Sequence, residues 1–146
     1  MKPLFILLTV LSSFMAQAKN NPGGEVTPAA LKSFSITFAQ ASDVTWTAID
    51  DMYKVSFQVA GQYASAYYSN NGNLMVVTRN ISSLQLPVVL LASIKKDYNQ
   101  KWISDLVEVS DENGTFYYVT LEDADQKLIL KSDGATRWNK YQKYEK

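Results

Sequence analysis

The sequence predicts an α+β fold of two tandem repeats, each a helix followed by a four-stranded antiparallel meander, with the helices packed on one face of the sheet. Three observations lead to this prediction. Apolar residues recur at helical spacing after Pro28 and again after Pro87. Runs of alternating polar and apolar residues follow each helix, as in half-buried strands. Short turn signals separate these runs, above all Asn71-Gly72 and Asp133-Gly134.

Residues 1–18 have the features of an export signal. One lysine precedes an apolar run that closes on Ala16-Gln17-Ala18, an A-x-A cleavage site. We expect residues 1–18 to be a cleaved signal peptide, so that the mature protein is periplasmic or secreted. A membrane anchor is the alternative, but the run is short for a membrane-spanning helix. Residues 19–26 are polar and contain Pro and Gly, which predicts a flexible leader.

The first repeat is expected over residues 27–82. Thr27 can cap a helix whose first turn holds Pro28, where the missing N–H costs nothing. Leu31, Phe34 and Phe38 then form one apolar stripe, and the helix is expected to end near residues 39–42. The expected strands are 44–49, 52–60, 62–69 and 73–79.

Tight turns fix the strand register of this repeat, and the register assigns side chains to faces. A two-residue turn at Asp50-Asp51 pairs Trp46 with Val55, and the next turn pairs Phe57 with Ala64. The face that the helix must cover is then predicted to hold Trp46, Tyr53, Val55, Phe57, Ala64, Ala66, Tyr68, Met75 and Val77. The opposite face is rich in hydroxyl groups, and Tyr63 and Tyr67 stand in it.

The second repeat is expected over residues 83–146. Its helix lies within 86–100, with Leu90, Ile94 and Tyr98 at helical spacing. The expected strands are 102–109, 115–122, 126–131 and 135–140, and the locally basic tail 137–146 is interpreted as a solvated end strand or a fraying end. Superposing the turns places Tyr117, Val119, Leu121, Leu128 and Leu130 on the inner face, and Phe116, Tyr118, Ile129 and Trp138 on the outer face.

These segments together resemble a known family. TPAALKSF, VTWTAIDDMYKVSF and YYSNNGNL, followed by LPVVLLASIKKDY, GTFYYVTLE and LKSDG, resemble the PepSY-like family of exported bacterial proteins, which is likened to beta-lactamase-inhibitor proteins. The resemblance covers nearly all of the mature chain, but Ser35, Thr37 and Lys101-Trp102 depart from the family pattern. It implies an α+β fold, an extracytoplasmic location, and binding or inhibition without catalysis. It supplies no catalytic residues.

The composition removes most catalytic chemistries. The chain has no histidine and no cysteine, which excludes Ser-His-Asp hydrolysis, cysteine nucleophiles and imidazole or thiolate metal sites. The carboxylates of Asp50-Asp51 are most simply turn formers, and residues 122–125 do not complete a calcium loop. A formal net charge of +0 gives no reason to expect nucleic acid. We therefore expect a protein that is not an enzyme and holds no cofactor or metal.

The outer-face aromatic residues are the candidate site. Tyrosine and tryptophan give large contact areas at low entropic cost and are common at binding hot spots. The predicted partner is an unidentified exported protein or peptide, and the predicted partner-binding residues are Tyr63, Tyr67, Phe116, Tyr118 and Trp138. The structural alternative is that these rings pack between the repeats or stabilise cross-strand neighbours. The functional alternatives are a small-ligand carrier, a self-associating envelope protein of the same fold, and a minimal enzyme with two carboxylates converging in a cleft.

Overall fold

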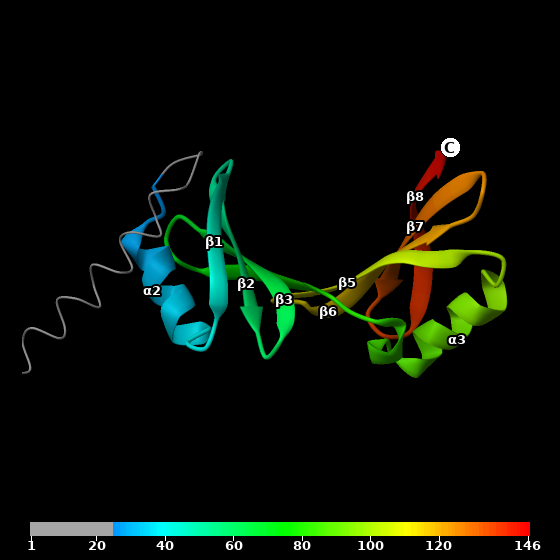
Figure 1. The fold of residues 1–146 in the computed structure, drawn as a ribbon, viewed down its shortest axis with the longest axis horizontal. Coiled ribbons are helices and arrows are strands. Elements are labelled where there is room, and N and C mark those ends of the chain that lie inside the picture. The colour runs from blue at the N-terminus through cyan, green and yellow to red at the C-terminus, as the bar shows by residue number, and fades with distance from the viewer. Residues whose placement is uncertain (1–24) are drawn as a thin grey trace, which may run out of the picture. The chain divides into compact units, whose positions relative to one another are not determined.

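The structure, a computed structural model, describes residues 25–146. The expected signal peptide 1–18 and all of the expected leader except Glu25 and Val26 lie outside these residues, and Val26 is buried. Two helices are each followed by four antiparallel strands, and the strands follow one another in a single sheet in the order β1-β2-β3-β4-β5-β6-β7-β8 (Figure 1). The described chain divides into two compact units, one up to Met75 and one from Val76.

Helix α2 (Pro28–Thr37) opens the first unit as expected. The Thr27 hydroxyl accepts a hydrogen bond from the Ala30 N–H at 3.4 Å and donates one to the Asn70 carbonyl at 2.9 Å. The helix ends at Thr37, before the expected residues 39–42. Phe38 leaves the helical conformation, with φ −122° and ψ 52°, and its ring packs 4.6 Å from that of Phe57.

Strands β1 (Ser42–Ile49), β2 (Met52–Val59) and β3 (Gln62–Ser69) have the predicted register. Trp46 faces Val55, and Phe57 faces Ala64. Asp50 and Ala60 take positive φ angles of 49° and 50° in the two turns. Tight turns of this kind match the twist of the strands that they join, which explains why the register could be predicted.

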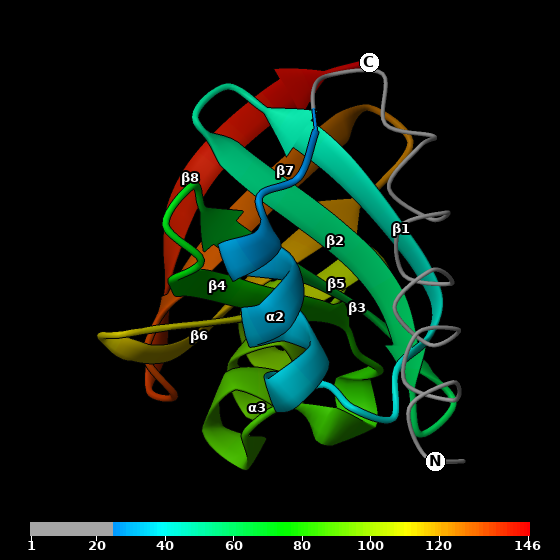
Figure 2. The ribbon, with the colours of Figure 1, turned by 90° about the vertical axis from the view of Figure 1, so that its left-hand side faces the viewer.

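The core of the first unit is aromatic. Helix α2 lies against one face of the first unit's sheet (Figure 2). Its Phe34 lies 5.4 Å from Trp46, 5.1 Å from Phe57 and 6.4 Å from Tyr68, measured between ring centroids, so one ring contacts three strands. The three contacts are edge-on, an arrangement that adds stability beyond burial alone. The Tyr68 hydroxyl is buried without a well-formed hydrogen bond. Burial raises the pKa of Tyr68, although the Thr37 and Ser33 hydroxyls partly oppose this.

Strand β4 (Leu74–Asn80) pairs with the second unit. Residues 76–80 face residues 107–111 of β5 (Trp102–Asp111). The prediction that Met75 belongs to the core of the first repeat is wrong, because Met75 is 47% exposed. From Val76 onward β4 belongs to the second unit, where it pairs with β5.

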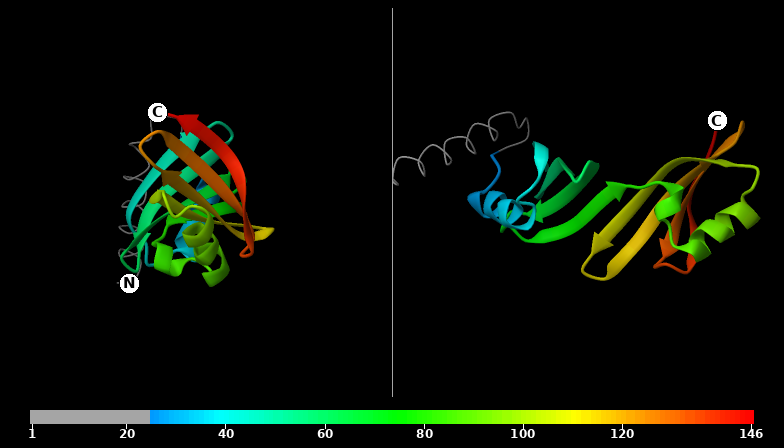
Figure 3. Two further views of the ribbon diagram at one scale, coloured as in Figure 1. Left: turned by 90° about the vertical axis from the view of Figure 1, so that its right-hand side faces the viewer. Right: turned by 60° about the horizontal axis from the view of Figure 1, so that its bottom comes forward.

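The second unit has its own core beneath α3 (Val88–Asp97), which follows the short 3-10 helix η2 (Ser83–Gln85). Strands β6 (Gly114–Glu122), β7 (Gln126–Asp133) and β8 (Arg137–Glu145) complete the unit (Figure 3). Leu90 and Ile94 of α3 are buried as predicted, and Tyr98 packs against the same cluster. The predicted inner strand positions Tyr117, Val119, Leu121, Leu128 and Leu130 are all buried.

Trp138 corrects the predicted register of β8. A two-residue turn at Asp133-Gly134 would place Trp138 opposite Ile129, on the outer face. Instead Asp133 faces Arg137 and Ser132 faces Trp138, so residues 134–136 form a three-residue loop. One added residue reverses the faces of a strand. The Trp138 indole therefore points to the helix side, where its N–H donates to the Leu90 carbonyl at 2.9 Å.

Candidate functional site: an aromatic sheet face

On the face of the second unit opposite α3, three aromatic rings cluster around a lysine. Phe116 and Tyr118 of β6 have ring centroids 5.8 Å apart, and Tyr118 lies 5.2 Å from Tyr141 of β8; both pairs meet edge-on. The Lys131 ammonium of β7 lies 4.5 Å from the Phe116 centroid and 5.7 Å from that of Tyr118. We call Phe116, Tyr118, Tyr141 and Lys131 the aromatic face.

Strand register gathers these side chains. Tyr118 directly faces Lys131 on β7, and Phe116 faces Val109 on β5. On the same face, Val109 is only 9% exposed and Thr120 only 8%, so the surface beside the rings is largely covered. Each aromatic pair or cation–π contact stabilises the arrangement by a fraction of a kcal/mol to about 1.5 kcal/mol. The aromatic face is thus an ordered surface with Tyr141 more than half exposed.

Tyr141 was missed by the sequence analysis. The expected last strand ended at residue 140, whereas β8 continues to Glu145. The register of β8 on β7 jumps from Lys140 to Gln142, so Tyr141 is the extra residue of a bulge. Bulges re-aim side chains, and here the bulge brings the Tyr141 ring to Tyr118. The signal that could have indicated a longer strand is the set of tyrosines that continues after Trp138, at Tyr141 and Tyr144, since aromatic residues favour strands.

Tyr63 and Tyr67 lie on β3 of the first unit, on the face opposite α2. Tyr63 faces Gln58 and is 67% exposed, while Tyr67 faces Lys54 and is half-buried. Between them, the hydroxyls of Ser65 and Ser56 form a hydrogen bond of 3.1 Å. The structure thus places these two tyrosines on the predicted face, four residues apart on one strand. Trp138, the fifth predicted residue, lies on the helix side of its own unit.

On the helix-facing side of the second unit, β4 and β5 carry a polar arrangement. Arg79 of β4 donates two hydrogen bonds to the Glu108 carboxylate of β5, at 2.7 and 3.2 Å. This bidentate contact raises the pKa of Arg79, and burial together with the Glu108 charge raises the pKa of Tyr117. Both shifts favour the forms that arginine and tyrosine already have at neutral pH, so the arrangement stabilises the sheet without offering an acid–base pair.

The turn between β6 and β7 holds the most strongly shifted carboxyl group. Lys101 donates a hydrogen bond to Asp123, and the backbone N–H groups of Asp125 and Gln126 donate two more at 2.9 and 2.8 Å. These bonds, the one from Lys101 first, lower the pKa of Asp123 from its ordinary 3.8 to about 2. Asp123 is therefore a structural anion of the turn.

We expect Asp123 to contribute acid-sensitive stability. Its pKa is lower in the folded chain than in the unfolded chain, so its contribution is present above about pH 4 and is lost as the pH falls toward about 2. The melting temperature of Asp123→Asn should lie below that of the unaltered protein at neutral pH, and the gap should narrow between pH 4 and 2. In a Lys101→Gln background, the gap in melting temperature between the proteins with and without Asp123→Asn should narrow less over the same pH range. A gap that stays constant with pH would contradict this role.

Residues 25–146 contain no group of three acidic side chains placed to hold a metal ion. Within the same residues, neither helix has the length and apolar character needed to cross a membrane.

Comparison with solved structures identifies the fold. A BLIP-like protein from Bacteroides fragilis superposes with a TM-score of 0.71 at 19% identity, over 85% of this chain and 89% of that one. A DUF2874 family protein from Bacteroides ovatus gives 0.73 at 14% identity, over 84% and 89%. A protein of Bacteroides eggerthii described as a proposed periplasmic protein gives 0.70 at 8% identity, over 80% and 90%. No protein-family model matches the chain, and no curated protein matches it in sequence. The chain therefore shares the BLIP-like fold, as its PepSY-like motifs indicated.

Proposed function

We propose that this is an exported, non-enzymatic binding protein that recognises another extracytoplasmic protein or peptide through its open sheet face. The observation that carries the proposal is the aromatic face, in which Phe116, Tyr118 and Tyr141 meet edge-on beside Lys131. Rings that are already ordered lose little entropy when a partner covers them. An antiparallel sheet covered by a helix on one side leaves its other side open to a partner.

The comparisons support the proposal at the level of the fold. One solved structure with a similar fold is described as a BLIP-like protein, and another as a proposed periplasmic protein. The expected signal peptide at residues 1–18 supports the same extracytoplasmic setting. Tyr63 and Tyr67 of the first unit form a second candidate contact surface, which we treat separately.

The test begins by finding a partner. Purified protein is immobilised beside a Phe116→Ala/Tyr118→Ala variant and a Tyr63→Ala/Tyr67→Ala variant, with the folding of each checked by circular dichroism. Envelope extract of the source cell is passed over all three, and retained proteins are identified by mass spectrometry. Ile36→Ala serves as the matched control, because Ile36 is an exposed apolar residue on α2.

We expect a partner that the unaltered protein and the Ile36→Ala control retain and that the Phe116→Ala/Tyr118→Ala variant loses. With the purified partner, the double substitution should weaken binding by about 30-fold or more, as for other aromatic hot spots. If the folded variants all retain the same proteins, or retain none, the aromatic residues serve the sheet alone. A partner that proves to be a second copy of this chain would instead favour the self-associating alternative.

A further inference from the structure

Strands β4 and β5 separate before β5 ends. Their register stops at the pair Asn80 and Val107, and the Ile81 N–H still donates to the Leu106 carbonyl at 3.0 Å. The chain then turns into η2, while β5 extends back to Trp102. In the register of the described chain, residues 102–105 of β5 have a neighbouring strand on the β6 side only.

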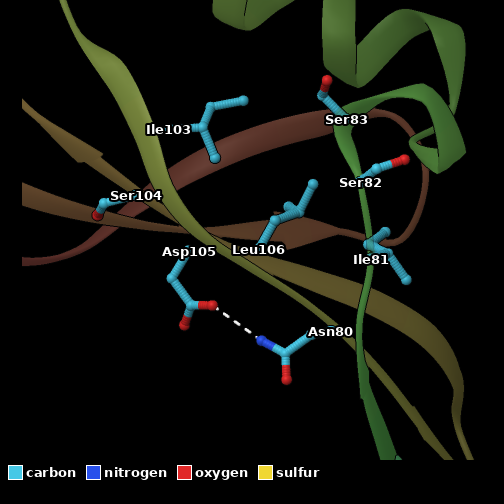
Figure 4. Close-up of a pocket in the computed structure, with 8 residues that line it drawn as sticks. All are labelled: Asn80, Ile81, Ser82, Ser83, Ile103, Ser104, Asp105 and Leu106. Atoms are coloured by element: carbon cyan, nitrogen blue, oxygen red, sulfur yellow. Dashed lines mark hydrogen bonds between the residues drawn. The ribbon is translucent and has the colours of Figure 1, made fainter. Parts of the chain in front are cut away.

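The separation leaves an opening beside this free length of β5. A depression of about 340 Å³ lies between residues 80–83 and residues 103–106, and Figure 4 shows Ile103 and Leu106 on one side of it with Ser82 and Ser83 on the other. A second depression, of about 290 Å³, is lined by Leu91, Ile94 and Lys95 of α3 and again by Ser83 and Ile103. The two depressions adjoin at these two residues, and we call them together the edge groove.

The edge groove has a different chemical character at each end. Near its opening, Asn80 donates a hydrogen bond to the Asp105 carboxylate at 2.9 Å. Its middle is apolar, where Ile103 faces Leu91 and Ile94 of α3. At the far end stands the exposed cation of Lys95, whereas the neighbouring Lys101 is already bound to Asp123.

We propose that the edge groove binds an extended peptide, which adds to β5 as a strand where β4 has turned away. Strand addition supplies main-chain hydrogen bonds, and the flanking pockets select alternate side chains. An antiparallel strand in this place continues the line of β4, so its C-terminal end lies near Trp102 and Lys95. The ligand is thus a segment with an apolar side chain for the Ile103 region and a carboxylate at its C-terminal end. This site is independent of the aromatic face.

The test selects peptides against the groove itself. A display library of random peptides of about ten residues is selected on the purified protein and counter-selected on Ser83→Trp, in which an indole fills the position common to both depressions. Selected peptides are synthesised with a free C-terminus, with an amidated C-terminus, with Gln in place of acidic residues, and with N-methyl groups at alternate positions. Their affinities and the backbone amide shifts that they cause are measured by NMR titration.

Two lysine variants test the predicted orientation of the bound peptide, with its carboxylate end near Lys95. Lys95→Glu reverses the charge at the end of the groove, and Lys96→Glu is the matched control, because Lys96 is exposed on the same helix but does not line the groove. We expect Lys95→Glu to lower the affinity for the selected peptides by about five- to tenfold, and Lys96→Glu to change it by less than about twofold. The amides of residues 102–105 should shift on binding.

Loss of affinity on N-methylation at one alternate set of positions would support strand addition, and this readout does not depend on the folding of any protein variant. The amidated and Gln peptides then distinguish a terminal carboxylate from an acidic side chain. The proposal is overturned if no peptide prefers the protein to Ser83→Trp, or if the N-methylated forms of the selected peptides bind as well as the unmodified ones. Shifts confined to the aromatic face would also overturn it, while leaving the proposed function intact.

Discussion

Replacing Gly72 with alanine is expected to destabilise the protein by about 3 kcal/mol, since strain and a steric clash act together. Gly72 has φ +82°, a conformation that side chains with a Cβ atom rarely adopt. A Cβ added there would lie 2.6 Å from the Ala29 carbonyl carbon and 2.7 Å from its oxygen. These are backbone atoms of α2, so relief requires the helix to shift. The free energy of unfolding, measured by urea titration, checks the prediction.

Gly61 supplies the matched control. It also has a positive φ, of +76°, but nothing lies within 4 Å of an added Cβ. Gly61→Ala should therefore cost only the conformational term, roughly 1 to 2 kcal/mol. The difference between the two variants measures the close approach of α2 to the turn. Equal losses in the two variants would show that the approach contributes nothing.

Replacing Phe57 with alanine is expected to cost about 3–5 kcal/mol, as large-to-small substitutions of buried aromatic residues do. Phe57 is 1% exposed, and its ring contacts Phe34 of α2 and Phe38, which directly follows the helix. The residual cavity would therefore lie between the sheet and the helix that covers it. Urea denaturation and the loss of near-ultraviolet circular dichroism from the aromatic cluster are the measurements.

The control for Phe57 is Tyr63→Ala on the adjacent strand. Tyr63 is another large aromatic residue of the same sheet, but it is 67% exposed on the opposite face. Its removal should change the free energy of unfolding by no more than about 0.5 kcal/mol. A comparable loss in both variants would mean that the face opposite α2 is covered, against the proposed open surface.

The first unit could be predicted from sequence almost residue by residue. Each of its first two hairpins turns through two residues, so the pairing of Trp46 with Val55 follows from counting outward from the turn. The buried stripe of α2 follows from helical periodicity in the same way. The second unit could be predicted less well, because the turn after β7 contains one more residue than its Asp133-Gly134 signal indicates. Loop length beyond the turn signal is decided by local packing.

That single residue decided the composition of the candidate site. Of the residues predicted to form it, Phe116 and Tyr118 meet on the aromatic face, while Trp138 lies on the helix side and bonds to Leu90. Tyr141 takes a place beside Tyr118 through a bulge. A bulge is an extra residue in the pairing of two strands, so its position depends on how those strands meet in the assembled sheet and not on the local sequence alone.

The sequence by itself determined the order of helices and strands, the inner stripe of each helix and the faces of the first three strands. Periodicity and turn chemistry are local properties, so they can be read from neighbouring residues. The tertiary structure alone decided which aromatic rings meet at the site, and it alone showed where β4 leaves β5 to open the edge groove. Both depend on strand register between distant segments, where one residue more or less moves a side chain to the other face.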